Sequence, residues 1–246
     1  NAARGIVGQV EGAVISLVSN FTTAFTPQIT KSYAEGNKDY MFSVICRGSK
    51  FSFLLLWLIV VPLEIEAPTL LKLWLKTVPE DTVLFLRLSL FCNLIMQLGG
   101  PCYTAIMATG NIRNYQIAVT VVGCLVFPLT LLAYHLGSGA QATYYIYFAI
   151  YLILVFIRLY FMKKLLGFEP KLFLRNSMLP LIPIILLSFI APLGFTLIMD
   201  EGIVRLVSVT IISIIWNIPI IYFFGLSISE KEKVRLLIFK RVGLCH

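Results

Sequence analysis

The sequence predicts an all-α membrane protein, built as a bundle of about seven transmembrane helices. Of its 246 residues, 59% are apolar and only 13% are charged, and the mean hydropathy is +0.89. Soluble domains carry about 45–50% apolar and about 25% charged residues, because water must wet their surface. Apolar runs close to the roughly 20 residues that a helix needs to cross a bilayer also recur along the chain.

The apolar runs set the expected order of spans. The second run has the shortest continuous apolar core, Phe51–Leu63. The third exceeds the minimum length and is expected to tilt or break near Gly99, Gly100 and Pro101. Prolines inside the last two runs predict kinked helices. The seven expected spans are 5–26, 43–65, 82–108, 114–136, 143–162, 177–199 and 203–226.

The positions of the cations predict the orientation. If the basic tail 229–246 is cytoplasmic, alternation of the spans places most of the 20 Lys and Arg residues on that same side. Such a bias is the usual pattern of multi-pass membrane proteins. The net charge of +8 is thereby explained by orientation. No interleaving of aromatic and basic residues on a polar face indicates a nucleic-acid partner.

Three connecting segments are expected at the membrane surface. The elbow Pro27–Lys50 is assigned to the cytoplasmic side, with Ser32–Lys50 as an amphipathic stretch on the inner leaflet. The outer connection 62–81 is predicted to be a separate interfacial helix with Trp74 at headgroup level. The tail 229–246 is predicted to be another. Tyr144, Tyr145, Tyr147 and Tyr151 are interpreted as an aromatic belt at the start of the fifth span.

Polar residues inside the spans are the candidate substrate-binding residues: Arg4, Glu11, Asn20, Arg87 and Gln97. A charge at the bilayer centre costs about 2.5–3.5 kcal/mol on insertion scales, so such residues usually face a cavity. Arg4 and Glu11 are about two helical turns apart and point the same way, and Arg87 and Gln97 share a broad face. Asn20 lies on a different face from Glu11.

This pattern predicts a hydrated cavity that contains both signs of charge. Arginines suit phosphate oxygens, because the guanidinium donates two parallel hydrogen bonds. The alternative is structural: Glu11 pairs with an arginine only to join helices, and Arg4 and Arg87 extend to the outer surface.

Catalytic and metal-binding patterns are poor. His135 and His246 are the only histidines, and the five cysteines are scattered and read as small buried apolar residues. Neither a zinc-protease motif nor a phosphate-binding glycine loop occurs. The sequence therefore predicts a transporter and not an enzyme, with no cofactor and no metal.

Three segments carry a family resemblance: "SNFTTAFTPQITKSYAEGN", "RGSKFSFLLLWLIVVPLEIEAPTLLKLWL" and "IMATGNIRNYQI". They resemble Wzx-type flippases of lipid-linked oligosaccharides, in the polysaccharide-transporter branch of the MATE-like (MOP) exporter superfamily. The resemblance implies alternating access that moves an undecaprenyl-pyrophosphate-linked oligosaccharide across the bacterial inner membrane for O-antigen and lipopolysaccharide export. It implies two helix bundles around a central cavity, in which arginines meet the pyrophosphate and Glu11 is a candidate proton or sodium site. Implied partners are the lipid-linked oligosaccharide, membrane lipid and polysaccharide polymerase machinery.

The chain begins at Asn1, and seven spans that end in a cytoplasmic tail correspond to the C-terminal half of such a transporter. Residues 1–228 would form one lobe, and the missing N-terminal lobe would be its partner. Three alternatives remain open: an ion-coupled MATE multidrug exporter with an acidic and aromatic cavity, a membrane oligosaccharide polymerase or ligase, and a non-transporting assembly partner. A polymerase usually needs a large outer loop, whereas the longest one here, 62–81, is short and apolar.

Overall fold

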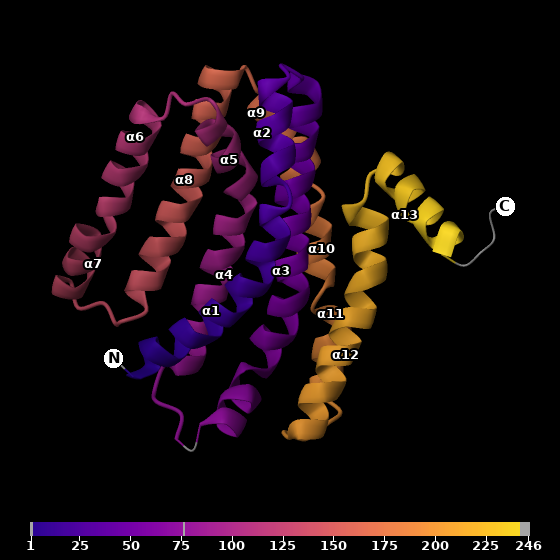
Figure 1. Cartoon of the computed structure of the whole chain (residues 1–246). Helices are drawn as coiled ribbons and strands as arrows, with labels where there is room; N and C mark the ends of the chain where they lie inside the picture. The colour runs from indigo at the N-terminus through magenta and orange to yellow at the C-terminus, as the bar shows by residue number, and fades with distance from the viewer. Residues whose placement is uncertain (1, 76, 242–246) are drawn as a thin grey trace.

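The computed structural model describes residues 2–75 and 77–241, and these residues form helices and no strands. Six helical stretches within them are long and apolar enough to cross a membrane. They lie side by side in one bundle (Figure 1). The prediction of an all-α, multi-pass membrane protein is therefore confirmed. The six stretches are Lys38–Trp74, Thr82–Ala108, Arg113–His135, Ala142–Leu166, Pro170–Thr196 and Ile203–Gly225.

The first predicted span, 5–26, forms helix α1 (Ala2–Thr23), which is not among the six stretches. Its polar residues, including Arg4, Glu11 and Asn20, lower its hydropathy. It runs obliquely across the bundle and packs on α4 (Thr82–Leu98) and α3 (Lys38–Trp74) (Figure 1). That α1 crosses the membrane stays a prediction.

The elbow after α1 consists of two helices joined by a tight turn. Helix α2 (Thr26–Ala34) has Pro27 in its first turn, where the missing N–H of proline costs nothing. Gly36 then takes a left-handed conformation with φ of +71°, and the side chain of Asn37 caps α3 by accepting a hydrogen bond from the Tyr40 amide at 3.1 Å. The amphipathic stretch predicted along Ser32–Lys50 is therefore not one continuous element, because this turn separates the end of α2 from the start of α3.

Helix α3 is 37 residues long and contains the whole of the predicted span 43–65. The separate interfacial helix predicted within 62–81 is also wrong, because α3 runs through Pro62 and Pro68 to Trp74. Each proline removes one backbone hydrogen bond, but packing against neighbouring helices can hold such a helix together. Pro62 and the two apolar side chains before it, Val60 and Val61, are indeed buried.

The third span breaks where the sequence predicted, between α4 and α5 (Gly100–Ala108). Gly99 at this break also makes room for a charged side chain. A Cβ atom there would lie 2.1 Å from a terminal guanidinium nitrogen of Arg158 on α8 (Ala142–Leu166). The Nε atom of Arg158 donates a hydrogen bond to the Tyr115 hydroxyl at 3.3 Å.

The fourth and fifth spans form a hairpin at the edge of the bundle. Helices α6 (Arg113–Cys124) and α7 (Val126–His135) make up the fourth, and both pack on α8. No residue of α7 is buried, and Phe127 is 76% exposed. This apolar outer face suits contact with lipid tails.

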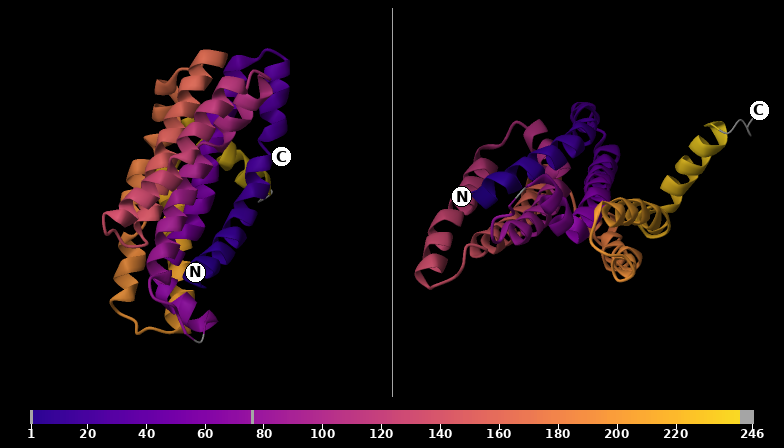
Figure 2. Two further views of the ribbon diagram at one scale, coloured as in Figure 1. Left: turned by 90° about the vertical axis from the view of Figure 1, so that its left-hand side faces the viewer. Right: turned by 90° about the horizontal axis from the view of Figure 1, so that it is seen from below.

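The last two spans are broken into short segments, as their prolines predicted. The sixth consists of α9 (Pro170–Phe173), the π-helical segment η1 (Leu174–Met178), α10 (Leu181–Leu187) and α11 (Ile190–Thr196). The seventh consists of α12 (Ile203–Ile220) and the π-helical segment η2 (Ile221–Gly225). Helix α13 (Ile228–Arg241) follows and projects away from the bundle (Figure 2). The predicted tail beyond it, 242–246, lies outside the described residues.

Three ion pairs connect α3 to the last part of the chain. Lys50 pairs with Glu230 of α13, with 2.6 Å between nitrogen and oxygen. Glu66 pairs with Arg205 of α12 at 2.9 Å, and Lys72 pairs with Glu201 at 2.7 Å. The pairs follow one another along α3, so this helix is the element against which the C-terminal segments are held.

The connections alternate between two ends of the bundle. Helix α2 and the connections 109–112 and 167–169 lie at one end, which we call the basic end (Figure 1). The connections 77–81, 136–141 and 197–202 lie at the other, which we call the opposite end. This alternation agrees with the predicted topology. The assignment of the basic end to the cytoplasm stays a prediction.

Candidate functional site

A polar cavity of about 300 Å³ lies between α1, α4 and α8. We call it the tyrosine cavity, because Tyr144, Tyr147 and Tyr151 of α8 form one wall. Two predicted site residues of α1, Arg4 and Glu11, line it together. The other lining residues are Gly8, Ser89, Cys92 and Asn93.

Glu11 is fixed at this cavity by a residue of the opposite wall. The side-chain amide of Asn93 donates a hydrogen bond to Glu11 Oε1 at 3.0 Å. The same nitrogen also donates to the Ser89 carbonyl one turn earlier, at 3.0 Å. Glu11 itself remains half-buried, so its carboxylate keeps access to the cavity. The contact joins α1 to α4.

Arg4 is the second charged residue that lines the same cavity. It is exposed, and no ion pair between Arg4 and Glu11 occurs among the described residues. Arg4 also lines a neighbouring hollow of about 160 Å³, which shares Tyr144 and Tyr147 with the tyrosine cavity. The guanidinium of Arg4 therefore stands beside both hollows without a carboxylate partner in the described part of the chain.

The structure separates the other three predicted residues from this cavity. The expectation that Arg87 and Gln97 share one cavity with Arg4 and Glu11 is not met, because neither lines the tyrosine cavity. Arg87 donates a hydrogen bond from Nε to the Glu64 carbonyl oxygen at 2.9 Å, and its Nε lies 3.9 Å from Glu64 Oε2. Asn20 is exposed on α1, and Gln97 is half-buried.

The geometry of α4 explains this division. Arg87 and Asn93 are six residues apart, which is about 240° around a helix at about 100° per residue. Asn93 therefore faces α1, whereas Arg87 faces Glu64 on α3. Asn93 and the three tyrosines are the site residues that sequence reasoning missed. Asn93 was not among the candidate residues, and the tyrosines were interpreted as an interface belt.

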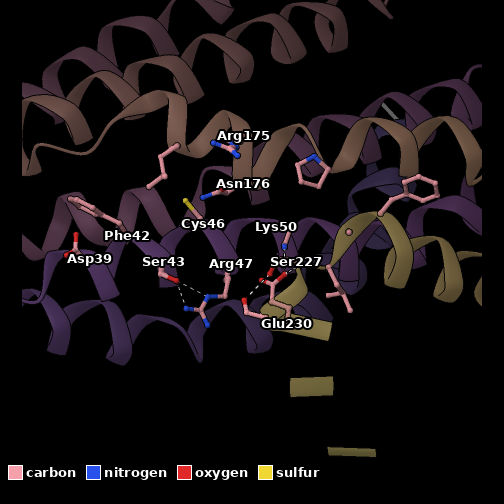
Figure 3. Close-up of a pocket in the computed structure, with 16 residues that line it drawn as sticks. Asp39, Phe42, Ser43, Cys46, Arg47, Lys50, Arg175, Asn176, Ser227 and Glu230 are labelled. Atoms are coloured by element: carbon pink, nitrogen blue, oxygen red, sulfur yellow. Dashed lines mark hydrogen bonds and ion pairs between the residues drawn. The ribbon is translucent and has the colours of Figure 1, made fainter. Parts of the chain in front are cut away.

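A second and larger cavity of about 620 Å³ lies near the basic end, between α3, η1 and the start of α13 (Figure 3). We call it the basic cavity. Its charged lining residues are Asp39, Arg47, Lys50, Arg175 and Glu230. The sequence assigned the three cations only to membrane orientation, so this site was not predicted.

Lys50 and Glu230 form a buried ion pair in the basic cavity. Their side chains are 4% and 9% exposed, and the Ser227 amide donates a further hydrogen bond to the same Glu230 oxygen at 2.8 Å. Burial raises the pKa of Glu230, but the hydrogen bonds from Lys50 and Ser227 and the charge of Lys50 together outweigh it. The net effect is a pKa below the ordinary value of 4.5, so this carboxyl is ionised at neutral pH.

The residues that the structure describes bring together no group of three or more His, Cys, Asp or Glu side chains. Cys46, Cys92 and Cys102 are buried free thiols, Cys124 is an exposed free thiol, and Cys245 lies outside the described residues. No family model, curated protein or solved structure matches this chain. The family suggested by the three sequence segments therefore stays a proposal.

Proposed function

We propose that this chain is one lobe of a bacterial inner-membrane flippase. Its substrate would be an undecaprenyl-pyrophosphate-linked oligosaccharide, carried from the cytoplasmic to the outer leaflet by alternating access. Two things support the proposal. One is the resemblance of the three sequence segments, and the other is the tyrosine cavity within a multi-pass helix bundle.

The observation that carries the proposal is that Arg4 and Glu11 line one cavity without pairing with each other. A closed ion pair would have a structural role and little capacity left for a ligand. An unpaired guanidinium can instead donate two hydrogen bonds to a phosphate group. Tyrosine hydroxyls both donate and accept hydrogen bonds, which suits the hydroxyl groups of a sugar.

The same cavity favours a second candidate function, the export of organic cations. Glu11 supplies a carboxylate, and the faces of Tyr144, Tyr147 and Tyr151 can attract a cation. Tyr147 and Tyr151 already stack on each other, with ring centroids 5.7 Å apart. Under this alternative Glu11 would bind the cationic substrate, and the positive charge of Arg4 would repel it.

Single substitutions in the full-length gene separate the two functions. We expect Arg4→Ala and Glu11→Ala each to reduce surface polysaccharide at least tenfold, while the lipid-linked precursor accumulates on the cytoplasmic side. Arg113→Ala is the matched control, because Arg113 is exposed at the basic end and lines neither cavity. Expression of each variant is checked by immunoblot.

The outcomes distinguish the alternatives. Normal polysaccharide export in both variants at normal expression would contradict the assignment of the site. Normal export together with sensitivity to organic cations in Glu11→Ala would favour the multidrug exporter. Precursor that reaches the outer leaflet but is not polymerised would favour a polymerase or ligase.

A further inference from the structure

The basic cavity collects cations from two separate elements. Arg47 and Lys50 are three residues apart on α3 and therefore lie on one side of the helix. Arg175 comes from η1, on the other side of the cavity (Figure 3). The cavity near the basic end therefore has three positive side chains in its lining, in addition to the cations at the surface of that end.

Two of these cations have no carboxylate partner in the described part of the chain. Arg47 donates from Nε to the Ser43 hydroxyl at 3.0 Å, and a terminal nitrogen also contacts that oxygen. Arg175 is exposed, and it forms no hydrogen bond or ion pair with any other described residue. Asp39, the second acid of the cavity, is exposed and pairs with neither arginine. Both guanidiniums keep free donors.

Lys50 is neutralised by a carboxylate that comes from the far end of the sequence. Glu230 lies 180 residues after Lys50, on a helix that otherwise projects away from the bundle (Figure 2). A buried ammonium needs a negative partner, since an uncompensated charge is costly in a low-dielectric site. Glu230 supplies this negative charge through Oε2, as a bound anion would do.

We propose that the basic cavity is a binding site for a phosphate ester or diphosphate ester, and that Glu230 is a built-in counter-ion which this ligand displaces. Phosphate offers more acceptor oxygens and more charge than a carboxylate, and Arg binds it in a bidentate manner. The cavity of about 620 Å³ is much larger than one phosphate group and also has apolar walls. Among these are Phe42, Leu172 and Phe224, which suit the organic part of an ester.

Displacement of Glu230 would have a structural consequence. The Lys50–Glu230 contact and the Lys231 bond to the Phe223 carbonyl at 2.9 Å hold the start of α13 to the bundle. A ligand that takes over Lys50 would remove the first of these contacts. Ligand binding and the release of α13 are therefore coupled. This inference does not depend on the proposed function, because the basic cavity and the tyrosine cavity share no residue.

Binding is tested on the purified full-length protein in detergent, by thermal unfolding with inorganic pyrophosphate as the probe. Potassium sulfate at equal ionic strength serves as the reference for non-specific screening. We expect pyrophosphate to stabilise the wild type more than sulfate does, with an apparent Kd raised at least tenfold in Arg47→Gln and in Arg175→Gln. Arg113→Gln should bind as the wild type does.

Glu230→Gln tests the counter-ion. Because it removes the competing charge, we expect about tenfold tighter pyrophosphate binding, whereas Glu232→Gln, an exposed acid on the same helix, should change nothing. Pyrophosphate should also speed proteolysis within α13 in the wild type, and this effect should be absent in Glu230→Gln.

The source of the ligand is identified with farnesyl diphosphate, which carries an apolar tail. Binding at least tenfold tighter than that of pyrophosphate indicates a lipid headgroup, and equal binding indicates a soluble phosphate ester. The proposal is overturned if sulfate stabilises as well as both diphosphates do, or if neither diphosphate stabilises the protein. It is also overturned if the two Gln variants bind like the wild type.

Discussion

The two cavities use charge in opposite ways. In the tyrosine cavity, Glu11 is held by a neutral amide, and Arg4 stands exposed without a carboxylate partner in the described chain. In the basic cavity, Lys50 and Glu230 neutralise each other at 2.6 Å and are almost fully buried. Buried pairs are costly to break, whereas exposed charges contribute little to stability. The comparison teaches that one buried ion pair, Lys50–Glu230, gives the basic cavity a part in stability. The tyrosine cavity contains no such pair among the described residues, so its charges contribute little to stability.

The largest effect on stability is expected at Lys50. Lys50→Met would leave Glu230 without its cation and should lower the free energy of unfolding by about 3–5 kcal/mol. Equilibrium unfolding in detergent measures the change. The control is Lys31→Met: Lys31 pairs with Glu35 at 3.7 Å on the surface of α2, and that loss should be about 0.5 kcal/mol or less.

The double variant Lys50→Met, Glu230→Gln sharpens this test, because it removes both charges. It should recover most of the lost stability. A loss of less than about 1 kcal/mol for Lys50→Met would show that the pair contributes no more than a surface pair does.

The unfolding free energy should also depend on pH through the Lys50–Glu230 pair, with a smaller effect than that of Lys50→Met. The folded pKa of Glu230 lies below 4.5, so the pair stabilises the fold above that pH and loses this contribution as pH falls through the folded pKa. The other charged groups that line the cavity are Lys50, Arg47, Arg175 and Asp39.

The measurement is the difference in unfolding free energy between the wild type and Glu230→Gln, at pH 7 and at pH 3.5. We expect the wild type to have the larger free energy of unfolding at pH 7, and the difference between the two proteins to be smaller at pH 3.5. A difference that grows on acidification would reverse the sign and refute the role of the ionised carboxyl.

An intermediate effect is expected at Asn93 in the tyrosine cavity. Asn93→Ala removes a partly buried hydrogen bond to a carboxylate and should cost about 1.5–3 kcal/mol. Asn20→Ala is the matched control, because Asn20 is exposed on α1 and its loss should stay within about 0.5 kcal/mol. Equal losses in the two variants would show that the contact between α1 and α4 is not specific.

The smallest effect on stability is expected at Arg4. Arg4→Gln should change the unfolding free energy by no more than about 0.5 kcal/mol, since the side chain is exposed and has no carboxylate partner in the described chain. Polysaccharide export in cells should nevertheless fall strongly. A variant that is unstable but exports normally would reverse the contrast between the two cavities.

Sequence reasoning found part of the tyrosine cavity for a physical reason. Arg4 and Glu11 interrupt an apolar run. A charge is costly in the hydrocarbon of the bilayer, so such residues usually face a cavity or a partner. The tyrosines gave no such signal, since aromatic residues are normal at the ends of spans. Asn93 was not among the candidate site residues, because it lies off the face that Arg87 and Gln97 share, and only the packing of α1 on α4 shows that it reaches Glu11.

The basic cavity could not be found in this way. Arg47, Lys50 and Arg175 lie near span ends, where cations are expected for orientation alone. Pro62 similarly begins the connection expected at 62–81, but α3 continues through it, where Pro62 is buried against neighbouring helices. Local rules identify helix breakers and topology signals, and the neighbours decide whether a break occurs.

The sequence by itself determined the class of protein, the order of six of the seven expected helical spans and the alternation of the basic connections. These follow from the length and hydropathy of local segments and from the bias of cations to one side. The tertiary structure alone decided which polar side chains meet. The Glu11–Asn93 contact joins residues 82 apart, and the Lys50–Glu230 contact joins residues 180 apart. No local pattern encodes such pairs, because they depend on how whole helices pack.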